Sequence, residues 1–257
     1  MERNRILTLL AMTALATAAM AQSEAGLILG AEAEKKVNRE LSVSLEADFR
    51  TRNDFRTVDR LGLGLGASYK IAKGLKADVG YKLLDYNNRE KVEYYTSAKG
   101  NDKIKWRPSY YGVKHRLHAS LTASHKFAGN VKLSLREGWQ YTYRPSKSTE
   151  RYKMNIAEQT QTLDTDYVRS AKAKNQLRSR LQVEYDRKRA LLTPYASVEL
   201  YNSWAVEKVR YTMGTDVRLG KQHGLEVYYR FQDMHNVDVD DYDPDMHFVG
   251  LGYKFKF

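Results

Sequence analysis

A histidine and a serine stand two positions apart at His118 and Ser120, and Glu137 follows in the next periodic segment. A serine nucleophile needs a base within hydrogen-bond reach and an orienting group behind that base. The three residues could therefore belong to a hydrolase acting on membrane lipid. However, His118 and Ser120 share a polar face with Arg116 and Thr122, whereas Glu137 is in phase with apolar residues. We keep the His-x-Ser hydrolase as the alternative function and rank a non-enzymatic function above it.

An acidic segment near the C-terminus concentrates carboxylate oxygens, the ligands that calcium takes. No glycine follows at the EF-hand position and no glutamate closes a twelve-residue loop, so that template fails. We expect a solvated loop drawn to the basic loops at 89–107 and 147–153, with calcium as the weaker alternative. The chain has no cysteine, which excludes disulfides and cysteine-ligated metals, and we expect no cofactor. The acidic residues are Asp238, Asp240, Asp241, Asp243 and Asp245.

Charged residues at every second position form the largest candidate set. If their segments are strands of a barrel of ten to twelve strands, this face points inward, and a radius of about 10 Å lets side chains from opposite walls meet. Two interpretations stay open: an ion-pair network that fills the barrel, or a narrow water-filled path whose arginine excess favours anions. The inward set is Glu46, Asp48, Arg50, Asp78, Lys82, Arg116, His118, Arg136, Arg178, Arg180, Glu184, Glu199, Arg210, Asp216, Arg218, Glu226 and Arg230.

The segments that carry these residues alternate between apolar and polar positions. In 61–71 the odd positions are apolar, and in 111–127 one face is apolar while the other carries charge. A period of two indicates strands, and each segment has about the length that a tilted membrane strand requires. The sequence therefore predicts an all-β fold, a transmembrane antiparallel up-and-down β-barrel of about 10 to 12 strands. The eleven predicted strands are 27–36, 41–52, 61–71, 75–86, 111–127, 131–144, 174–186, 192–202, 209–219, 225–232 and 247–257.

The connections alternate in length. Short turns at 72–74, 128–130, 186–190 and 220–224 fit the periplasmic side, and long segments at 87–109, 145–173 and 233–246 fit the cell exterior. Both ends of a closed bacterial barrel normally lie in the periplasm, which requires an even number of strands. We therefore expect one error in the count: either 27–36 does not span, or a segment such as 92–98 adds a strand.

Both ends of the chain carry signals of export. Residues 1–21 combine a basic start, an apolar run too short to span a bilayer as a helix, and a small-residue cleavage pattern, which predicts a secretory signal peptide. Residues 22–257 then form the outer-membrane barrel. In the last strand Tyr253, Phe255 and the terminal Phe257 share one face, which predicts the signal that the barrel-assembly machinery recognises for insertion. An edge strand of a secreted β-sandwich is the alternative.

The formal net charge of +12 favours anionic partners. For an exported barrel we expect these to be outer-membrane lipid, lipopolysaccharide and anionic solutes, and no nucleic acid. The predicted localisation is the bacterial outer membrane. The predicted function is a small anion-preferring channel or a plugged membrane scaffold whose external loops recognise a ligand.

Several segments resemble those of a family of uncharacterised outer-membrane barrels of Gram-negative bacteria, defined as a domain of unknown function. They are LREGWQYTYRP (135–145), LRSRLQVEYD (177–186), TPYASVELYN (193–202), LEVYYRFQ (225–232) and FVGLGYKFKF (248–257). The resemblance covers nearly the whole chain after the signal. It implies the fold and the location, and it brings no known activity or site residues.

Overall fold

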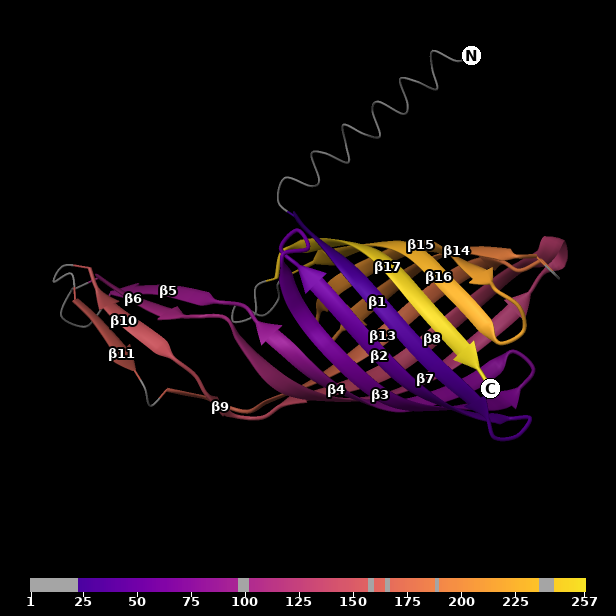
Figure 1. Cartoon of the computed structure of the whole chain (residues 1–257), viewed down its shortest axis with the longest axis horizontal. Coiled ribbons are helices and arrows are strands. Elements are labelled where there is room, and N and C mark those ends of the chain that lie inside the picture. The colour runs from indigo at the N-terminus through magenta and orange to yellow at the C-terminus, as the bar shows by residue number, and fades with distance from the viewer. Residues whose placement is uncertain (1–22, 97–101, 157–159, 165–166, 188–189, 236–242) are drawn as a thin grey trace, which may run out of the picture.

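The computed structural model describes residues 23–96, 102–156, 160–164, 167–187, 190–235 and 243–257. Its main body is a closed β-barrel, and a smaller sheet projects from one end (Figure 1). Among the described residues, no helix is long and apolar enough to cross a membrane. The barrel strands are β1 (Ser23–Lys36), β2 (Leu41–Arg52), β3 (Thr57–Ala72), β4 (Leu75–Asn88), β7 (Tyr110–Lys126), β8 (Val131–Arg144), β13 (Lys172–Tyr185), β14 (Leu192–Asn202), β15 (Val206–Arg218), β16 (His223–Met234) and β17 (Asp245–Lys256).

The barrel therefore has eleven strands, within the predicted range of 10 to 12, and all eleven predicted segments are strands of its wall. The expectation of an even number is wrong. Every neighbouring pair is antiparallel except β1 and β17, which run parallel, with Leu27 opposite Val249 and Leu29 opposite Leu251. Consequently β1 starts at the end from which the small sheet projects, whereas the C-terminus lies at the opposite end (Figure 1).

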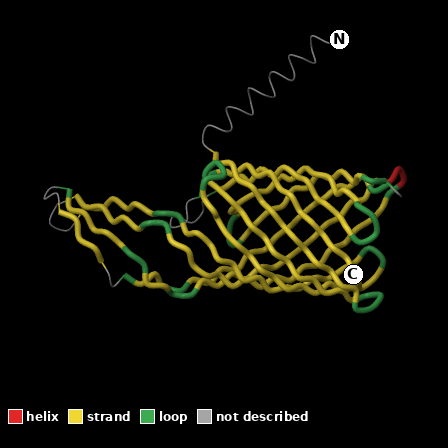
Figure 2. The backbone as a smooth tube through the Cα atoms, viewed as in Figure 1, coloured by secondary structure: helices red, strands yellow, loops and turns green. Residues whose placement is uncertain are grey.

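The two ends of the barrel differ in their connections, as predicted. One end, here called the short-turn end, carries the connections β1–β2, β3–β4, β7–β8, β13–β14 and β15–β16, including the single turn η1 (Ala128–Asn130). The other, the long-loop end, carries the extended connections β4–β7, β8–β13 and β16–β17 (Figure 2). Positive φ at Gly74, Gly129 and Gly220 permits the tight chain reversals at the short-turn end.

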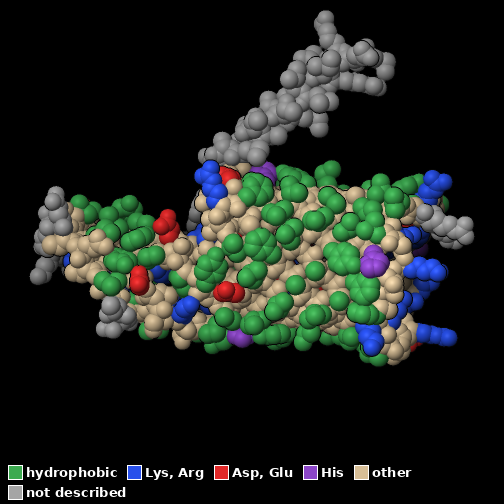
Figure 3. Space-filling model, viewed as in Figure 1, with side chains coloured by type: hydrophobic (Ala, Val, Ile, Leu, Met, Phe, Trp, Pro, Cys, Tyr) green, Lys and Arg blue, Asp and Glu red, His purple; other side chains and the backbone are tan. Residues whose placement is uncertain are grey.

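Apolar side chains cover the outside of the wall, which is why the segments alternate. Leu63 and Leu65 on β3 are each 63% exposed, and exposed aliphatic residues recur on every neighbouring strand. Figure 3 shows this apolar surface along the wall between the two ends. An antiparallel sheet that faced water on its outside would carry polar residues there. The outer face is thus suited to a bilayer.

Small residues make room for the inward side chains. On β3 the inward positions include Gly62 and Gly64; a Cβ on Gly64 would lie 3.0 Å from Cε of Lys82, and one on Gly62 would meet the Asp48 carboxylate. The glycine row therefore lets ion pairs cross the inner surface. Elsewhere on the inner surface, residues of β1, β16 and β17 form an apolar cluster: Ile28, Tyr228, Met246 and Phe248, with Tyr195 packed against it.

The projecting sheet consists of β5 (Lys91–Thr96), β6 (Asp102–Arg107), β10 (Arg151–Asn155) and β11 (Thr160–Asp164), in the order β11-β10-β6-β5. Beside it, β9 (Lys147–Ser148) pairs with β12 (Val168–Arg169). Of the segment 92–98, residues 92–96 lie in β5 and therefore do not add a strand to the barrel; residues 97–98 lie outside the described residues. One row across the sheet is apolar, with Trp106 stacked on Tyr152 at a centroid distance of 5.0 Å. This row is Val92, Trp106, Tyr152 and Leu163.

Candidate anion site in the barrel lumen

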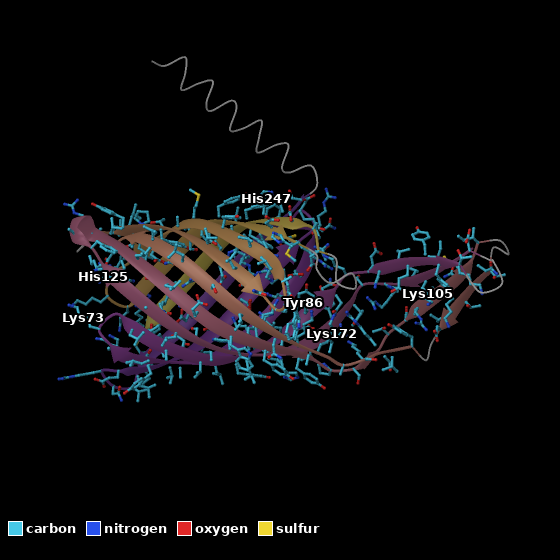
Figure 4. All side chains as sticks on the ribbon, turned by 180° about the vertical axis from the view of Figure 1, so that it is seen from behind. Lys73, Tyr86, Lys105, His125, Lys172 and His247 are labelled. Carbon is cyan, nitrogen blue, oxygen red and sulfur yellow. The ribbon has the colours of Figure 1, made fainter. Side chains whose placement is uncertain are left out.

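A cavity of about 1170 Å³ occupies the lumen toward the long-loop end. Among its described lining residues sixteen are Lys or Arg and four are Asp or Glu. Tyr86 and Lys172, two lining residues, lie where the barrel meets the base of the projecting sheet (Figure 4). The imbalance of charge makes this chamber strongly attractive to anions.

Ion pairs lie on the strands β2, β3 and β4, where Arg60 and Lys82 belong to the lining of the chamber. Asp48 accepts from Arg60 at 3.0 Å and lies 3.8 Å from Lys82, which is 3.0 Å from Glu46. Toward the short-turn end, Asp78 is 2.7 Å from Lys76. Both Glu46 and Asp48 are therefore neutralised by neighbours on the same wall, as in the ion-pair interpretation of the inward charges.

Tyr201 on β14 is the centre of a cationic cluster at the chamber floor. It is 2% exposed, and its ring lies 4.8 Å from the guanidinium of Arg178, 4.4 Å from Nζ of Lys208 and 4.5 Å from the guanidinium of Arg210. Glu199 accepts two hydrogen bonds from Arg178, at 2.7 and 3.2 Å, and one from the Tyr201 hydroxyl at 2.9 Å. Cation–π contacts and one carboxylate thus hold three cations around a single ring.

Two further contacts show how the cluster is completed from other strands. Arg50 on β2 is 7% exposed and lies 4.6 Å over the Phe248 ring. Arg116 on β7 donates from Nε to Thr142 at 3.4 Å. Within the part of the chain that the structure describes, neither arginine forms a salt bridge, and Lys208 forms none either. The lumen therefore contains cations beyond those that its carboxylates neutralise.

These cations interact across the lumen. Arg50 is repelled by Arg60, Arg210 and Arg230, with Asp59 as the acid that attracts it. Lys208 is repelled by Arg210, Arg116 and Arg50, with Asp243 as the acid that attracts it. Because β2, β7 and β15 belong to different parts of the wall, like charges face one another across the lumen. Such an arrangement is unfavourable unless an anion lies between them.

The rim of the chamber is closed on one side by a salt-bridge group. Arg89 donates to Glu24 at 2.6 and 2.9 Å and to Asp243 at 3.0 Å. Burial disfavours the charged guanidinium, but the hydrogen bonds to Glu24 and the charge of Asp243 outweigh it and hold the pKa of Arg89 above its ordinary value. Arg89 thus ties the β4–β5 connection to the start of β1 and of β17.

The salt bridges of Arg89 fix the position of part of the acidic loop. Asp243 pairs with Arg89, and Asp245 accepts from the backbone N–H of Met234 at 2.8 Å. The other three aspartates of the loop, Asp238, Asp240 and Asp241, lie outside the described residues. Among the residues that are described, no three His, Asp or Glu side chains form a group that could hold a metal ion.

A smaller cavity of about 410 Å³ lies toward the short-turn end. Its lining includes Arg136, which donates from Nε to Thr122 at 3.1 Å, and Arg180. Glu184 on the same lining is 3.0 Å from Lys132. The two remaining arginines of the inward set lie in different surroundings. Arg230 donates to Thr212 beside the apolar cluster, and Arg218 is exposed at the short-turn end.

The three residues of the hydrolase alternative do not converge. Ser120 donates to Asp78 at 3.5 Å and lies on the inner face with His118. Glu137 is on the outer face, where it accepts from Ser179 at 2.6 Å between exposed leucines. The wall therefore separates the Glu137 carboxylate from the His-x-Ser pair, and these three residues do not form a catalytic group.

The C-terminal aromatic residues lie on the outer surface of the last strand. Tyr253 is 41% exposed and Phe257 is 68% exposed, and Phe255 packs edge-on against Phe257 at 4.6 Å. The backbone N–H of Phe257 donates to the Glu34 carbonyl at 2.9 Å, which ties the end of β17 to β1.

Sequence reasoning missed two central residues of the cluster, Tyr201 and Lys208. Tyr201 occupies an inward position of its strand, in phase with Glu199, and this phase was the available signal. Lys208 lies one residue before the predicted start of its strand at 209, whereas β15 begins at Val206. An aromatic residue among arginines and a strand boundary two or three residues off were sufficient to hide both.

Comparisons with known proteins agree with this architecture. The crystal structure of the β domain of the Bordetella autotransporter BrkA is similar, with a TM-score of 0.50, 14% sequence identity and coverage of 86% of each chain. At that identity the likeness shows the fold alone, which is that of an outer-membrane type of β-barrel. No curated protein matches the chain. The profile of a family described as "Protein of unknown function (DUF2490)" matches residues 26–243. The chain therefore belongs to the DUF2490 family.

Proposed function

We propose that this protein is exported to the outer membrane of a Gram-negative bacterium, where its barrel gives anionic solutes a selective path through the lumen. The observation that carries the proposal is the lining of the upper chamber, with sixteen basic and four acidic side chains among the described residues. Rings of basic side chains select anions in pores. The long-loop end faces the cell exterior in this proposal.

The partners follow from the same surfaces. The apolar outer wall would contact membrane lipid, and basic residues of the projecting sheet such as Lys103 and Lys105 would contact lipopolysaccharide phosphates outside. The exposed face of Tyr253 and Phe257 would be recognised by the barrel-assembly machinery. The projecting sheet, with strands of five or six residues, is the part of the protein best placed to recognise a ligand outside.

Single-channel conductance of the folded protein in a planar bilayer tests the path. With a salt gradient, we expect discrete current steps and a reversal potential on the anion-selective side. Replacing Arg116 by glutamate reverses a charge inside the chamber and should shift the reversal potential toward cation selectivity. The matched control is Arg39→Glu, the same change in an exposed turn outside the lumen, which should leave selectivity unchanged.

Two results would contradict the proposal. A correctly folded protein that gives no current over many insertions would leave only the plugged scaffold. Current steps whose selectivity responds equally to the Arg116 and Arg39 variants would place the selecting charges outside the chamber.

A further inference from the structure

Three cations at the floor of the chamber converge from separate parts of the wall, and none of them forms a salt bridge with a carboxylate among the described residues. They are Arg50 on β2, Arg116 on β7 and Lys208 on β15, and all three line the same cavity. We propose that they form, with Arg210, a binding site for a phosphate group that carries about two negative charges. This deepens the proposed function, because it names the class of anion that the lumen takes.

The number of cations favours phosphate over a carboxylate or chloride. A monovalent anion would neutralise one of the three and leave the others in mutual repulsion. A phosphate monoester has a charge of about −1.5 to −2 at neutral pH and three strong acceptor oxygens. It can therefore contact several of these cations together, and the planar guanidinium fork suits two phosphate oxygens at once.

The donors are held in place before any anion arrives. Arg210 donates from Nε to Gln232 at 2.9 Å, and Arg116 donates from Nε to Thr142 at 3.4 Å. Arg50 is held over the Phe248 ring, and its buried Nε has no hydrogen-bond partner among the described residues. Because contacts to neutral groups, and for Arg210 also the nearby Glu199 carboxylate at 3.8 Å, position these side chains, little conformational entropy remains to be lost when they bind an anion.

The proposed site is reached from the long-loop end. The cavity of about 1170 Å³ includes both the rim residue Arg89 and the floor residues Lys208 and Arg210. The closed wall separates the floor from surrounding lipid. A soluble phosphorylated compound is therefore the expected occupant, and a lipid headgroup could enter only through the loops.

Isothermal titration of the purified, folded protein with pyrophosphate tests the site without any conductance measurement. We expect saturable binding that weakens with salt, and about tenfold or greater weakening in Arg116→Gln and in Lys208→Gln, because each removes a charged hydrogen-bond donor. The matched control is Arg136→Gln, which removes an arginine from the smaller cavity and should change the affinity less than twofold.

Folding is not expected to obscure the result, since each substitution removes a charge from a cluster of like charges. Circular dichroism and urea unfolding of each variant check this. Equal weakening by all three substitutions would overturn the site, since it would reflect net charge, and so would the absence of binding to a folded wild-type protein. Either result leaves the selectivity measurement of the proposed path unaffected.

Competition experiments distinguish the sources of the phosphate. Glycerol phosphate and a short-chain phosphatidic acid both carry a phosphate monoester. In glycerol phosphate this group is on a small soluble molecule, and in phosphatidic acid it is the headgroup of a lipid. Stronger competition by glycerol phosphate supports a soluble occupant, whereas stronger competition by phosphatidic acid supports the same phosphate chemistry on a lipid headgroup. Failure of both to compete with bound pyrophosphate would overturn the assignment to phosphate.

Discussion

Removing the carboxylate of Glu199 should destabilise the barrel more than any other single change in the lumen. Glu199 is 8% exposed and accepts hydrogen bonds from Arg178 and from the Tyr201 hydroxyl. It also lies 3.8 Å from Arg210. In Glu199→Gln the two guanidinium groups keep their charges and lose their shared counter-ion.

The magnitude follows from the burial of the group. Removing one partner of a buried ion pair costs about 3–5 kcal/mol. Because the Arg178 side chain is 29% exposed to solvent, we expect a loss of stability at the lower end of this range, about 3 kcal/mol. With a urea dependence of about 1–3 kcal/mol per molar, the unfolding midpoint should fall by at least about 1 M. Tyr201→Phe, which removes a neutral hydroxyl that donates to Glu199 and accepts from Arg210, should cost less, about 1.5 kcal/mol.

Urea unfolding of the protein in lipid vesicles, followed by tryptophan fluorescence, measures these differences. The double variant Arg178→Gln with Glu199→Gln removes both members of the pair and should recover much of the loss, which completes a double-mutant cycle. A loss of less than about 1 kcal/mol in Glu199→Gln would mean that water in the lumen screens the cluster, and the reasoning from burial would be refuted.

Three other predictions test separate parts of the structure. An epitope tag inserted directly before Ser23 should be accessible to antibody on intact cells, whereas a tag in the turn 220–222 should not, because β1 starts at the long-loop end; reversed labelling would reject the parallel closure. In the projecting sheet, side-chain hydrogen bonds from Arg151 and, to a smaller extent, Lys153 lower the pKa of Asp164 below its ordinary value of 3.8. The sheet should therefore keep this stabilisation above pH 3.8 and lose it as the pH falls through the lowered pKa. Near-ultraviolet circular dichroism should show the loss in wild type and not in Asp164→Asn. Finally, Glu137→Leu should stabilise the barrel in a bilayer by about 1 kcal/mol, because a carboxylate facing hydrocarbon is unfavourable, and an unchanged urea midpoint would contradict a lipid-facing position.

The wall could be predicted from the sequence because each strand contacts two different environments. On β3, Leu63 and Leu65 face outward while Gly62 and Gly64 face the ion pairs, so the period of two is strong. The projecting strands were not predicted as a sheet, since each has only two or three alternations. A pattern as short as Ile104 and Trp106 does not separate a strand from a loop.

The closure of the barrel could not be predicted, because alternation records the face of a strand and not its neighbour. The parallel pairing of β1 with β17 places Ile28 opposite Gly250, and the antiparallel pairing of β1 with β2 places it opposite Arg50. The even-number rule assumes that both termini lie at one end, and nothing in the residues of β1 tests that assumption. The inward apolar residues Ile28 and Phe248 were the one local departure from alternation at the junction of β1 with β17.

The junction of β1 with β17, here called the seam, explains why the cationic cluster exists only in the closed barrel. Arg50 on β2 comes close to Arg230 and Arg210 because β1 and β17 are the strands that join β2 to β16. At this level the seam has small or apolar inward residues, Ile28 and Gly250, so no carboxylate from β1 or β17 intervenes. An open sheet would leave Arg50 far from β15 and β16 and exposed to water, where its charge would cost little. Closure therefore creates the like-charge repulsion at the chamber floor, and an anion bound there would stabilise the closed barrel as well as occupy its lumen.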